Sequence, residues 1–268
     1  MDILNNIFVC IILFIIYNYI IIIFLKGQMK IINIDSNEKE LKKERKLHNS
    51  LSKLPHELIN PIAVCKVYLE MLNLDDKEKT AKYVNIIKSE MNRSLSVIND
   101  FSSYGKLKKL ELEEIDIVYL LEEVKESLLP LFNFNDAYIE IISQEEIYIQ
   151  ADYSRLKQVF INLLKNTLEA KKQDKHLHVK IEIREFKKKI KIRIKDNGIG
   201  MDKNTLDHIA ELFFTTKENG TGIGIAYSKE VVELHGGTIN YKSTINKGTE
   251  VLIILPKEKS PKTFNHRN

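Results

Sequence analysis

A repeat of apolar residues over 47–72 constrains the fold of this chain more than any other feature. The apolar positions follow in steps of 4-3-4-4-3-4-3, at Leu47, Leu51, Leu54, Leu58, Ile62, Cys65, Leu69 and Leu72. Steps of three and four keep these side chains on one face of an α-helix, as in a coiled coil. The doubled step of four is a stutter that loosens a supercoil, and Pro61 beside it removes a backbone donor. The repeat therefore predicts a helix with one packing seam and an irregular turn near its middle.

His56 and Glu57 lie in that irregular turn. His56 is two residues from both Leu54 and Leu58, so at about 100° per residue its ring turns roughly 200° away from each of them. An outward histidine beside a glutamate is usually a solvated surface pair. Imidazole is also a nucleophile near neutral pH, and a neighbouring carboxylate can orient the ring and take its proton. This stretch alone leaves both interpretations open.

The helix with His56 is expected to be one arm of a hairpin. It should begin near Ser36 and end near Asn73, and a polar turn over 73–76 leads to a second helix over 77–104. The second helix has one inward face, at Tyr83, Ile87, Met91, Ser94, Ile98 and Phe101. Helices with so short a connection pack antiparallel, and a single hairpin leaves apolar surface on both arms. Two copies can bury that surface in a four-helix bundle, so we expect a homodimer.

Residues 7–25 form an almost uninterrupted apolar run. As a helix this run is about 28 Å long, enough to cross the hydrocarbon core of a bilayer. A signal peptide is the first alternative, but no basic residue precedes the run and no small-residue cleavage pattern follows it. A buried core helix is the second, but it would seldom be apolar on every face. The run therefore predicts a single membrane span.

The charges beside this run predict its orientation. Only Asp2 is charged before it, whereas basic residues follow from Lys26 onward, which places the C-terminal side in the cytoplasm. The protein is then a single-pass protein of the cell membrane, with the domains that follow residue 45 in the cytoplasm. Residues 1–6 form a short external N-terminus, and residues 26–45 form a juxtamembrane linker helix.

Charge and cysteine content exclude several classes of function. The net charge is +4, and basic and acidic residues are interspersed, so nucleic-acid binding is not favoured. No zinc-ligand or helix-turn-helix spacing is present. Cys10 and Cys65 lie in different segments, so neither a disulfide framework nor a metal site is predicted, which fits a reducing cytoplasm.

After the helical domain at 46–105, the pattern changes over 106–257 to a mixture of strands and helices. Strands are expected at 138–142, 147–149, 179–186, 190–194, 238–243 and 249–255, and helices at 118–131 and 154–171. Such a mixture predicts an α/β sandwich. The polar tail at 258–268 is expected to be disordered.

Four motifs occur in this second domain. They are Asn162-Leu163-Leu164-Lys165-Asn166-Thr167-Leu168-Glu169-Ala170, Asp196-Asn197-Gly198-Ile199-Gly200-Met201, Phe213-Phe214-Thr215-Thr216-Lys217 and Gly220-Thr221-Gly222-Ile223-Gly224. Gly248-Thr249, before the last strand, adds a fifth element. Each motif alone is weak to moderate, and Asp-x-Gly-x-Gly is often only a tight turn. Five in this order, after His-Glu-x-x-Asn-Pro, are hard to attribute to coincidence.

With these motifs, residues 35–257 resemble a sensor histidine kinase of two-component systems. His56-Glu57-x-x-Asn60-Pro61 resembles the phospho-acceptor box of its dimerisation domain. The later motifs resemble its ATP-binding domain, whose fold is shared with gyrase and mismatch-repair ATPases. The Phe-Thr-Thr-Lys segment followed by Gly-Thr-Gly-x-Gly looks most like the subgroup of sporulation and nitrogen-regulatory kinases. Thr167 departs from the family, which usually has alanine at this position.

The resemblance implies a role for each residue of the phospho-acceptor box. His56 accepts the phosphoryl group, and Glu57 orients the ring and takes its proton. Asn60, one turn later, is associated in the family with dephosphorylation of the partner regulator, where it would hold a water molecule. A polar helix residue that merely precedes Pro61 is an equal alternative for Asn60.

The resemblance also implies an ATP site with Mg²⁺. Asn166 can ligate Mg²⁺ through its amide oxygen, and Asn162, one turn before it, can reach the phosphates. Gyrase-like ATPases carry a water-activating glutamate at the position of Asn162, so an amide there argues for phosphoryl transfer to protein instead of hydrolysis. Asp196 can accept the adenine amino group. The segment Phe213 to Lys217 is expected to be a lid over the triphosphate, and backbone amides at the helix start after Gly220-Thr221-Gly222-Ile223-Gly224 can hold phosphate oxygens. The remaining expected ATP contacts are Lys165, Gly198, Gly200, Phe214, Thr216, Lys217, Gly220, Thr221, Gly222, Ile223, Gly224 and Thr249.

The function predicted from the sequence is that of a membrane-anchored, homodimeric kinase. It would phosphorylate its own His56 with Mg·ATP and pass the phosphoryl group to an aspartate in the receiver domain of a response regulator. A phosphorelay scaffold that no longer uses ATP is one alternative, and intact Asn166 and Asp196 argue against it. A serine kinase of the anti-sigma type is another, and it lacks the histidine hairpin. The sequence leaves open the signal, the regulator, and whether transfer occurs within or between subunits.

Overall fold

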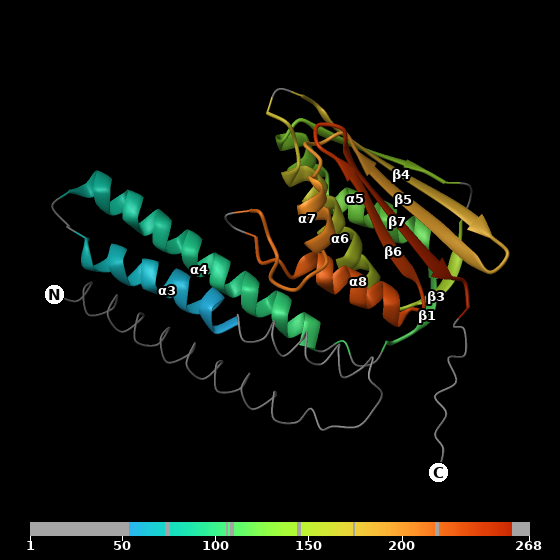
Figure 1. Cartoon of the computed structure of the whole chain (residues 1–268), viewed down its shortest axis with the longest axis horizontal. Coiled ribbons are helices and arrows are strands. Elements are labelled where there is room, and N and C mark those ends of the chain that lie inside the picture. The colour runs from blue at the N-terminus through green and yellow to red at the C-terminus, as the bar shows by residue number, and fades with distance from the viewer. Residues whose placement is uncertain are drawn as a thin grey trace, which may run out of the picture.

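The computed structural model describes residues 54–258, with gaps at 73–75, 106, 108–109, 144–145, 174 and 218–219. The described part consists of a helical hairpin beside an α/β domain (Figure 1). The expected span at 7–25, the linker at 26–45 and the tail from 259 onward lie outside the described residues, as do the side chains of Leu54 and His56. Among the helices that are described, none is both long and apolar enough to cross a membrane.

The helical hairpin is formed by α3 (Leu54–Glu70) and α4 (Lys77–Gly105), which pack along each other. The predicted seam of α3 faces α4, because Leu58 and Cys65 are buried and Cys65 Sγ lies 3.7 Å from the carbonyl oxygen of Ile87. Farther along, the rings of Tyr68 and Tyr83 lie 5.2 Å apart between their centroids. The predicted hairpin is therefore confirmed for its described residues.

The end of α3 differs from the prediction. The helix ends at Glu70, before the predicted end near Asn73. Its last turn tightens, since the amide of Leu72 donates to the carbonyl of Leu69, three residues back. A tightened turn of this kind commonly closes a helix. The predicted start near Ser36 lies outside the described residues.

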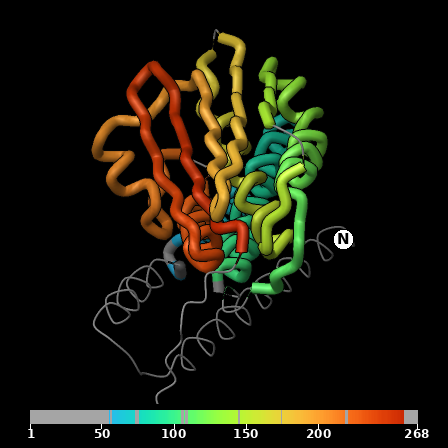
Figure 2. The backbone as a smooth tube through the Cα atoms, turned by 90° about the vertical axis from the view of Figure 1, so that its right-hand side faces the viewer, coloured from blue at the N-terminus to red at the C-terminus, as the bar shows by residue number. Residues whose placement is uncertain are grey.

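The α/β domain contains a five-stranded mixed sheet with helices on one face. The strand order is β2 (Ala137–Ile142), β4 (Leu177–Phe186), β5 (Lys189–Asp196), β7 (Gly248–Pro256) and β6 (Thr238–Thr244). The first pair is parallel and the others are antiparallel. In Figure 2 the strands lie side by side nearest the viewer, with helices behind or beside them. The predicted α/β sandwich is confirmed.

The core lies between this sheet and its helices. The covering helices are α5 (Ile117–Phe134), α6 (Tyr153–Glu169) and α8 (Gly224–Leu234). Strands β4 and β5 alternate buried aliphatic residues, such as Ile181 and Ile192, with half-buried or exposed polar and charged ones. Phe160 of α6 and Leu120 of α5 are fully buried against them. Full burial of one such side chain stabilises the folded state by about 1.5–3 kcal/mol. The alternation of aliphatic and polar residues along the strands therefore largely specifies which face of the sheet the helices cover.

Two short elements were not predicted. Strand β1 (Glu113–Asp116) pairs antiparallel with β3 (Tyr148–Ala151) in a separate two-stranded sheet. Only one residue of β1, Ile115, is buried, so its sequence has no readable alternation. Helix α7 (Lys203–His208) has no buried residue. Its sequence therefore has no apolar face from which a helix could be predicted.

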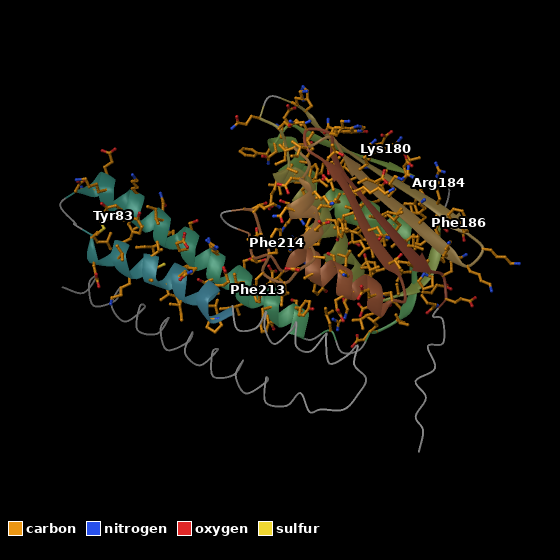
Figure 3. The ribbon with its side chains drawn as sticks, in the orientation of Figure 1. Tyr83, Lys180, Arg184, Phe186, Phe213 and Phe214 are labelled. Carbon is orange, nitrogen blue, oxygen red and sulfur yellow. The ribbon has the colours of Figure 1, made fainter. Side chains whose placement is uncertain are left out.

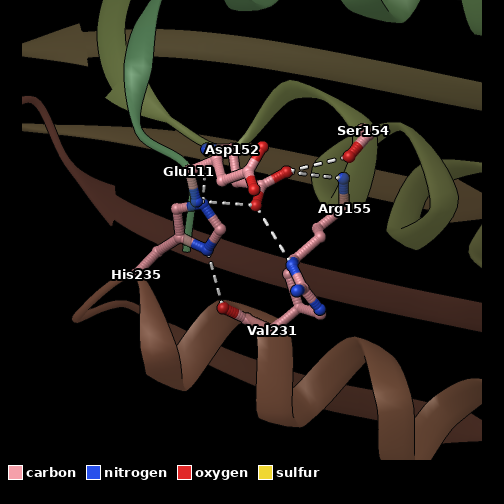
Figure 4. A network of polar contacts seen from close by, with 6 residues as sticks. All are labelled: Glu111, Asp152, Ser154, Arg155, Val231 and His235. Atoms are coloured by element: carbon pink, nitrogen blue, oxygen red, sulfur yellow. Dashed lines mark hydrogen bonds and ion pairs between the residues drawn. The ribbon is translucent and has the colours of Figure 1, made fainter. Parts of the chain in front are cut away.

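A buried polar network fixes α6 and α8 relative to each other (Figure 4). Asp152 caps α6 by accepting a hydrogen bond from the amide of Arg155, and it also accepts the amide of Glu111 at 3.0 Å. His235, just after α8, accepts the amide of Asp152 through Nε2 at 2.9 Å. Its Nδ1 donates to the carbonyl of Val231, so the ring is neutral with its proton on Nδ1. Burial lowers the pKa of His235, which keeps the ring in this form.

Candidate functional site

The two asparagines of α6 lie where the motif predicted, on one face of the helix and half-buried. Asn162 Oδ1 accepts a hydrogen bond from Gln158, and its Nδ2 lies 3.5 Å from the carbonyl oxygen of Gly224. Asn166 Oδ1 accepts a hydrogen bond from Lys217 Nζ at 2.8 Å. The structure therefore brings Asn162 to the start of α8 and Asn166 to the segment with Lys217.

Lys217 makes a second contact that the sequence did not indicate. Its ammonium group pairs with the carboxylate of Glu169, one turn after Asn166 on α6. The cation thus lies at the amide oxygen that was expected to ligate Mg²⁺. Lys165, also on α6, is exposed, and its charge attracts the carboxylate of Asp100 on α4.

Asp196 is the central residue of the part of the expected ATP site that would bind adenine. It is the last residue of β5, is 4% exposed, and accepts the amides of Gly198 at 2.8 Å and Thr249 at 3.1 Å through Oδ1. Its Oδ2 accepts no hydrogen bond from any described residue, so it remains able to accept one from an amino group. Burial raises the pKa of the Asp196 carboxyl group despite these hydrogen bonds and the charge of Lys172.

Close backbone packing around Asp196 requires the glycines of the second motif. Gly200 has a φ of +68°, and a Cβ on it would collide with the carbonyl oxygen of Thr244. A Cβ on Gly198 would come within 2.5 Å of the carbonyl oxygen of Ala170, at the end of α6. The loops after α6, β5 and β6 are therefore packed against one another at this end of the sheet.

Ser243 is a residue of this site that sequence reasoning missed. Its Oγ accepts the amide of Met201 at 2.8 Å, donates to the carbonyl of Gly248 at 3.0 Å and lies 2.9 Å from Thr249 Oγ1. It links the Gly-x-Gly turn to Gly248-Thr249. A lone serine in a strand gives no signal of such a role.

The aromatic segment before Lys217 is held in an unusual backbone conformation. Phe213 is buried and has a φ of 66°, a region that costs a bulky residue of the order of 1–3 kcal/mol. Its amide donates to the carbonyl of Gly222 at 2.9 Å, and Gly222 itself has a φ of +65°. Phe214 is half-buried, with its ring 5.7 Å from that of His208. This backbone hydrogen bond joins the start of the expected lid, at Phe213, to the glycine-rich motif that follows it.

The middle of the expected lid is exposed to solvent. Thr216 is exposed, and Gly220 is packed so close to Thr215 that a Cβ on it would collide with the threonine hydroxyl. Residues 218–219 lie outside the described part.

The start of α8 has the features of a phosphate cradle. The helix begins at Gly224, and Ile223 at its N-cap position is fully buried and caps no amide with its side chain. The first amides of a helix have no partner within it and carry partial positive charge, so uncapped ones can bind phosphate oxygens. The motif Gly220 to Gly224 thus leads directly into this uncapped helix start.

A contact between the two domains is the feature that the sequence did not predict. Thr221 Oγ1 donates to Asp100 Oδ2 of α4 at 2.8 Å, and burial raises the pKa of Asp100. Around this hydrogen bond, one apolar cluster joins the two domains, formed by Leu58, Val97, Leu212, Phe213, Ile223 and Ala226. Figure 3 shows Phe213 and Phe214 between the helical hairpin and the α/β domain.

The phospho-acceptor box lies in the first turns of α3. The side chain of His56 is outside the described part, so no contact of its ring is stated. Glu57 is half-buried and its carboxylate lies 3.7 Å from Arg93 of α4, a partner that the sequence did not indicate. Asn60 is exposed. Leu58, two residues after His56, belongs to the cluster that contains Phe213, so this turn of α3 adjoins the expected lid.

The donor set fits Mg²⁺ bound together with ATP. Among the described residues, no group of three or more His, Cys, Asp and Glu side chains could hold a metal ion by itself. Mg²⁺ at ATP sites, however, commonly uses only one or two protein oxygens and completes its shell with phosphates and water. Asn166 Oδ1 is one such oxygen, and Lys217, which now contacts it, would have to move.

Comparison with known proteins gives two family matches. Residues 47–109 match the His Kinase A (phospho-acceptor) domain, and residues 151–259 match the histidine kinase-, DNA gyrase B- and HSP90-like ATPase domain. Sporulation kinase B of Bacillus subtilis is 31% identical over 206 residues, which are 76% of this chain and 48% of that protein. Sporulation kinase E of the same organism is 32% identical over 223 residues, 82% of this chain and 30% of that protein. The chain thus spans half the length or less of these two relatives.

Solved structures give the same fold. The histidine kinase ThkA, in a complex with the response regulator protein TrrA, superposes with a TM-score of 0.65 at 25% identity, over 84% of this chain and 68% of that one. Full-length ShkA in complex with AMPPNP superposes with a TM-score of 0.59 at 22% identity, over 81% of this chain and 46% of that one. The likeness to ShkA concerns the fold alone.

Proposed function

The chain belongs to the sensor histidine kinases, in the group of the sporulation kinases, and we propose that it transfers the γ-phosphoryl group of ATP to His56. From His56 the group would pass to an aspartate in the receiver domain of a response regulator. The observation that carries this proposal is the convergence of Asn162, Asn166 and the uncapped start of α8 in a domain that packs against the His56 helix.

The residues of the ATP site have separate tasks. Asp196 Oδ2 accepts the adenine amino group, while the Gly198 and Thr249 amides fix the carboxylate. The first amides of α8 hold phosphate oxygens. Asn166 Oδ1 would ligate Mg²⁺, which when bound neutralises charge on the phosphates. Asn162 is an amide and cannot activate water, so the site favours a protein acceptor over hydrolysis.

The transfer step requires Glu57 to exchange partners. A ring nitrogen of His56 forms a bond to the γ-phosphorus as the bond to the β-phosphate oxygen breaks, and the ring loses its remaining proton. Glu57 is adjacent in sequence and can receive that proton. In the described arrangement its carboxylate faces Arg93 at 3.7 Å, a weak ion pair at a half-buried position that a reorienting side chain can leave.

A homodimer is proposed from apolar surface that the single hairpin leaves exposed. Five large apolar residues of the hairpin are between 37% and 52% exposed: Ile59, Val64, Val67, Met71 and Leu95. A second copy would bury them in a four-helix bundle. The match to the phospho-acceptor domain supports this state.

Membrane anchoring and phosphatase activity are further parts of the proposal. The apolar run at 7–25 and the basic residues after it support a single span with the described domains in the cytoplasm. Asn60 is exposed one helical turn after His56, where it can position water for removal of phosphate from the regulator.

Labelling with γ-³²P-ATP tests the proposal against its alternatives. The full chain should acquire label that is lost in acid and kept in alkali, as phosphohistidine is, and should pass it to a purified receiver domain. The matched control is His176→Gln, which replaces an exposed histidine of the ATP-binding domain and should label normally. Acid-stable label on the chain would indicate a serine kinase. A chain that acquires no label from ATP but still exchanges phosphate with a phosphorylated receiver domain would indicate a phosphorelay scaffold.

A further inference from the structure

The hairpin of β4 and β5 carries the most concentrated positive charge in the described part of the chain. Residues 180–195 contain eight lysines and arginines and two glutamates, a net charge of +6, whereas the whole chain has a net charge of +4. The inward positions of this hairpin are buried isoleucines, so the basic residues occupy the outer face and the turn. No described helix covers this face of the sheet.

The tip of the hairpin, Phe186 to Lys191, combines this charge with an exposed aromatic ring. Phe186 ends β4 and is 47% exposed, and Lys187 and Lys188 form the turn before Lys189. Figure 3 shows Lys180, Arg184 and Phe186 in order along β4 toward this turn. The acidic residue beside the tip, Glu185, is paired with Lys257, so it subtracts little from the field of the lysines.

Farther from the tip, the charges are largely paired. Glu182 lies 3.2 Å from Lys180, 3.9 Å from Arg184 and 3.6 Å from Arg193. A hollow on the outer face is lined by Glu182, Arg184 and Arg193 together with Phe186 and Lys191. The lysines of the tip, in contrast, form no ion pair with a described carboxylate, so the tip is where the positive charge is least compensated.

We propose that this tip docks on an anionic lipid bilayer, with Phe186 in the interface and the lysines at the headgroups. Aromatic rings favour the membrane interface, lysine side chains can extend to the phosphates, and a few basic residues near an anionic surface provide attraction. An acidic protein would satisfy the charge, but it would not require an exposed ring at the extremity of the molecule.

The position of the tip agrees with a membrane on that side. In Figure 1 the end of the hairpin at which α3 ends and α4 begins lies at one end of the described part, and the β4–β5 turn lies at the other. Helix α3 begins at Leu54, at the end of its hairpin away from the α3–α4 turn. With the bilayer on the side at which α3 begins, as the proposed anchoring implies, the β4–β5 tip is on the same side. The placement of the bilayer, but not the charge of the tip, rests on the proposed anchoring.

A single tryptophan tests the proposal, because the chain contains none. The full-length Phe186→Trp variant is combined with vesicles of phosphatidylcholine alone or of equal parts phosphatidylcholine and phosphatidylserine, each with brominated acyl chains as quencher. We expect a shift of the emission to shorter wavelength and quenching in the anionic vesicles, and little of either in the neutral ones. Salt of about 1 M, where the Debye length is about 3 Å, should remove the effect without releasing a chain held by its span.

Two variants make the result specific. Changing Lys187, Lys188 and Lys189 together to Gln should return the quenching to the neutral-vesicle level, since each lysine near an anionic surface contributes roughly fivefold in affinity. The matched control changes three exposed lysines of α4, Lys77, Lys82 and Lys88, and should leave the quenching unchanged. A reporter at Phe134, which is 88% exposed and has no lysine within five positions in the sequence, should not be quenched.

Equal emission in neutral and anionic vesicles would overturn the proposal. So would a response that needs an added receiver protein, which would assign the tip to a protein partner. Autophosphorylation of the same preparations keeps the outcomes separate, because the triple lysine variant should label like the wild type. Release of the whole chain from vesicles at alkaline pH would refute the proposed span and leave the test of the tip intact.

Discussion

Replacing Asp100 by asparagine should strengthen ATP binding. Asp100 places a half-buried carboxylate at 2.8 Å from the hydroxyl of Thr221, in the loop expected to hold the phosphates. When ATP binds there, this carboxylate and the phosphates repel each other. The asparagine side chain would keep an oxygen that can accept the Thr221 hydrogen bond and would remove the charge, so Asp100→Asn isolates the electrostatic effect.

The magnitude follows from Coulomb's law. Two unit charges about 8 Å apart, at an effective dielectric constant of about 20, repel by about 2 kcal/mol, which corresponds to about 30-fold in affinity. Two features of the site reduce this. Burial raises the pKa of Asp100, so part of the repulsion can be relieved by proton uptake, and Lys165 compensates part of the charge. We therefore expect ATP affinity to rise by about 3- to 10-fold.

Isothermal titration of the full chain with Mg·ATP measures this effect. Glu78→Gln removes an exposed carboxylate of the same helix and should leave the affinity unchanged. Because the pKa of Asp100 is raised, the wild type should protonate this group as the pH falls, and the ratio of the two affinities should approach one. An Asp100→Asn variant that binds ATP no better than the wild type would refute the reasoning.

Three other predictions depend on single features. Asp196→Asn should weaken ATP binding by about 10- to 100-fold in the same titration, because an amide nitrogen cannot accept from the adenine amino group and a buried charged hydrogen bond contributes about 1.5–3 kcal/mol. The unfolding free energy should fall as the pH drops below about 6.5, the pKa of an unfolded histidine. The pKa of His235 is lowered in the folded protein, so the neutral ring stabilises the fold above that pH and this stabilisation is lost as the ring becomes protonated. Urea titrations should show a weaker pH dependence for His235→Gln. Deletion of residues 1–30 should leave a soluble dimer that autophosphorylates at a constitutive rate, and a monomeric, inactive product would make the span a required dimerisation element.

The sequence predicted the elements whose pattern is local. Strands β4 and β5 alternate buried and exposed residues over most of their length, so their existence and faces could be read directly. The motif residues also contact other motif residues: Asn162 lies beside Gly224, Asn166 accepts from Lys217, and Asp196 accepts from Thr249. Strand β1, with a single buried residue, has too short a pattern to detect.

The contacts that the sequence missed are long-range. The carboxylate of Asp100 meets Thr221 across 121 positions of the chain, and Lys217 meets Asn166 across 51. Glu57 likewise meets Arg93 on the other arm of the hairpin. No local periodicity encodes such pairs, because they depend on how the two domains and the lid segment pack. Their effect on the site is nevertheless direct, since each engages a residue that was assigned to ATP or to the acceptor turn.

The most direct test of the central claim is autophosphorylation of His56→Gln, with ATP affinity measured on the same preparation. The acceptor lies on α3 and the nucleotide residues lie in the α/β domain, so we expect the variant to bind ATP nearly as tightly as the wild type and to acquire no acid-labile phosphate. Acid-labile phosphate retained by His56→Gln would contradict the assignment of His56 as the acceptor.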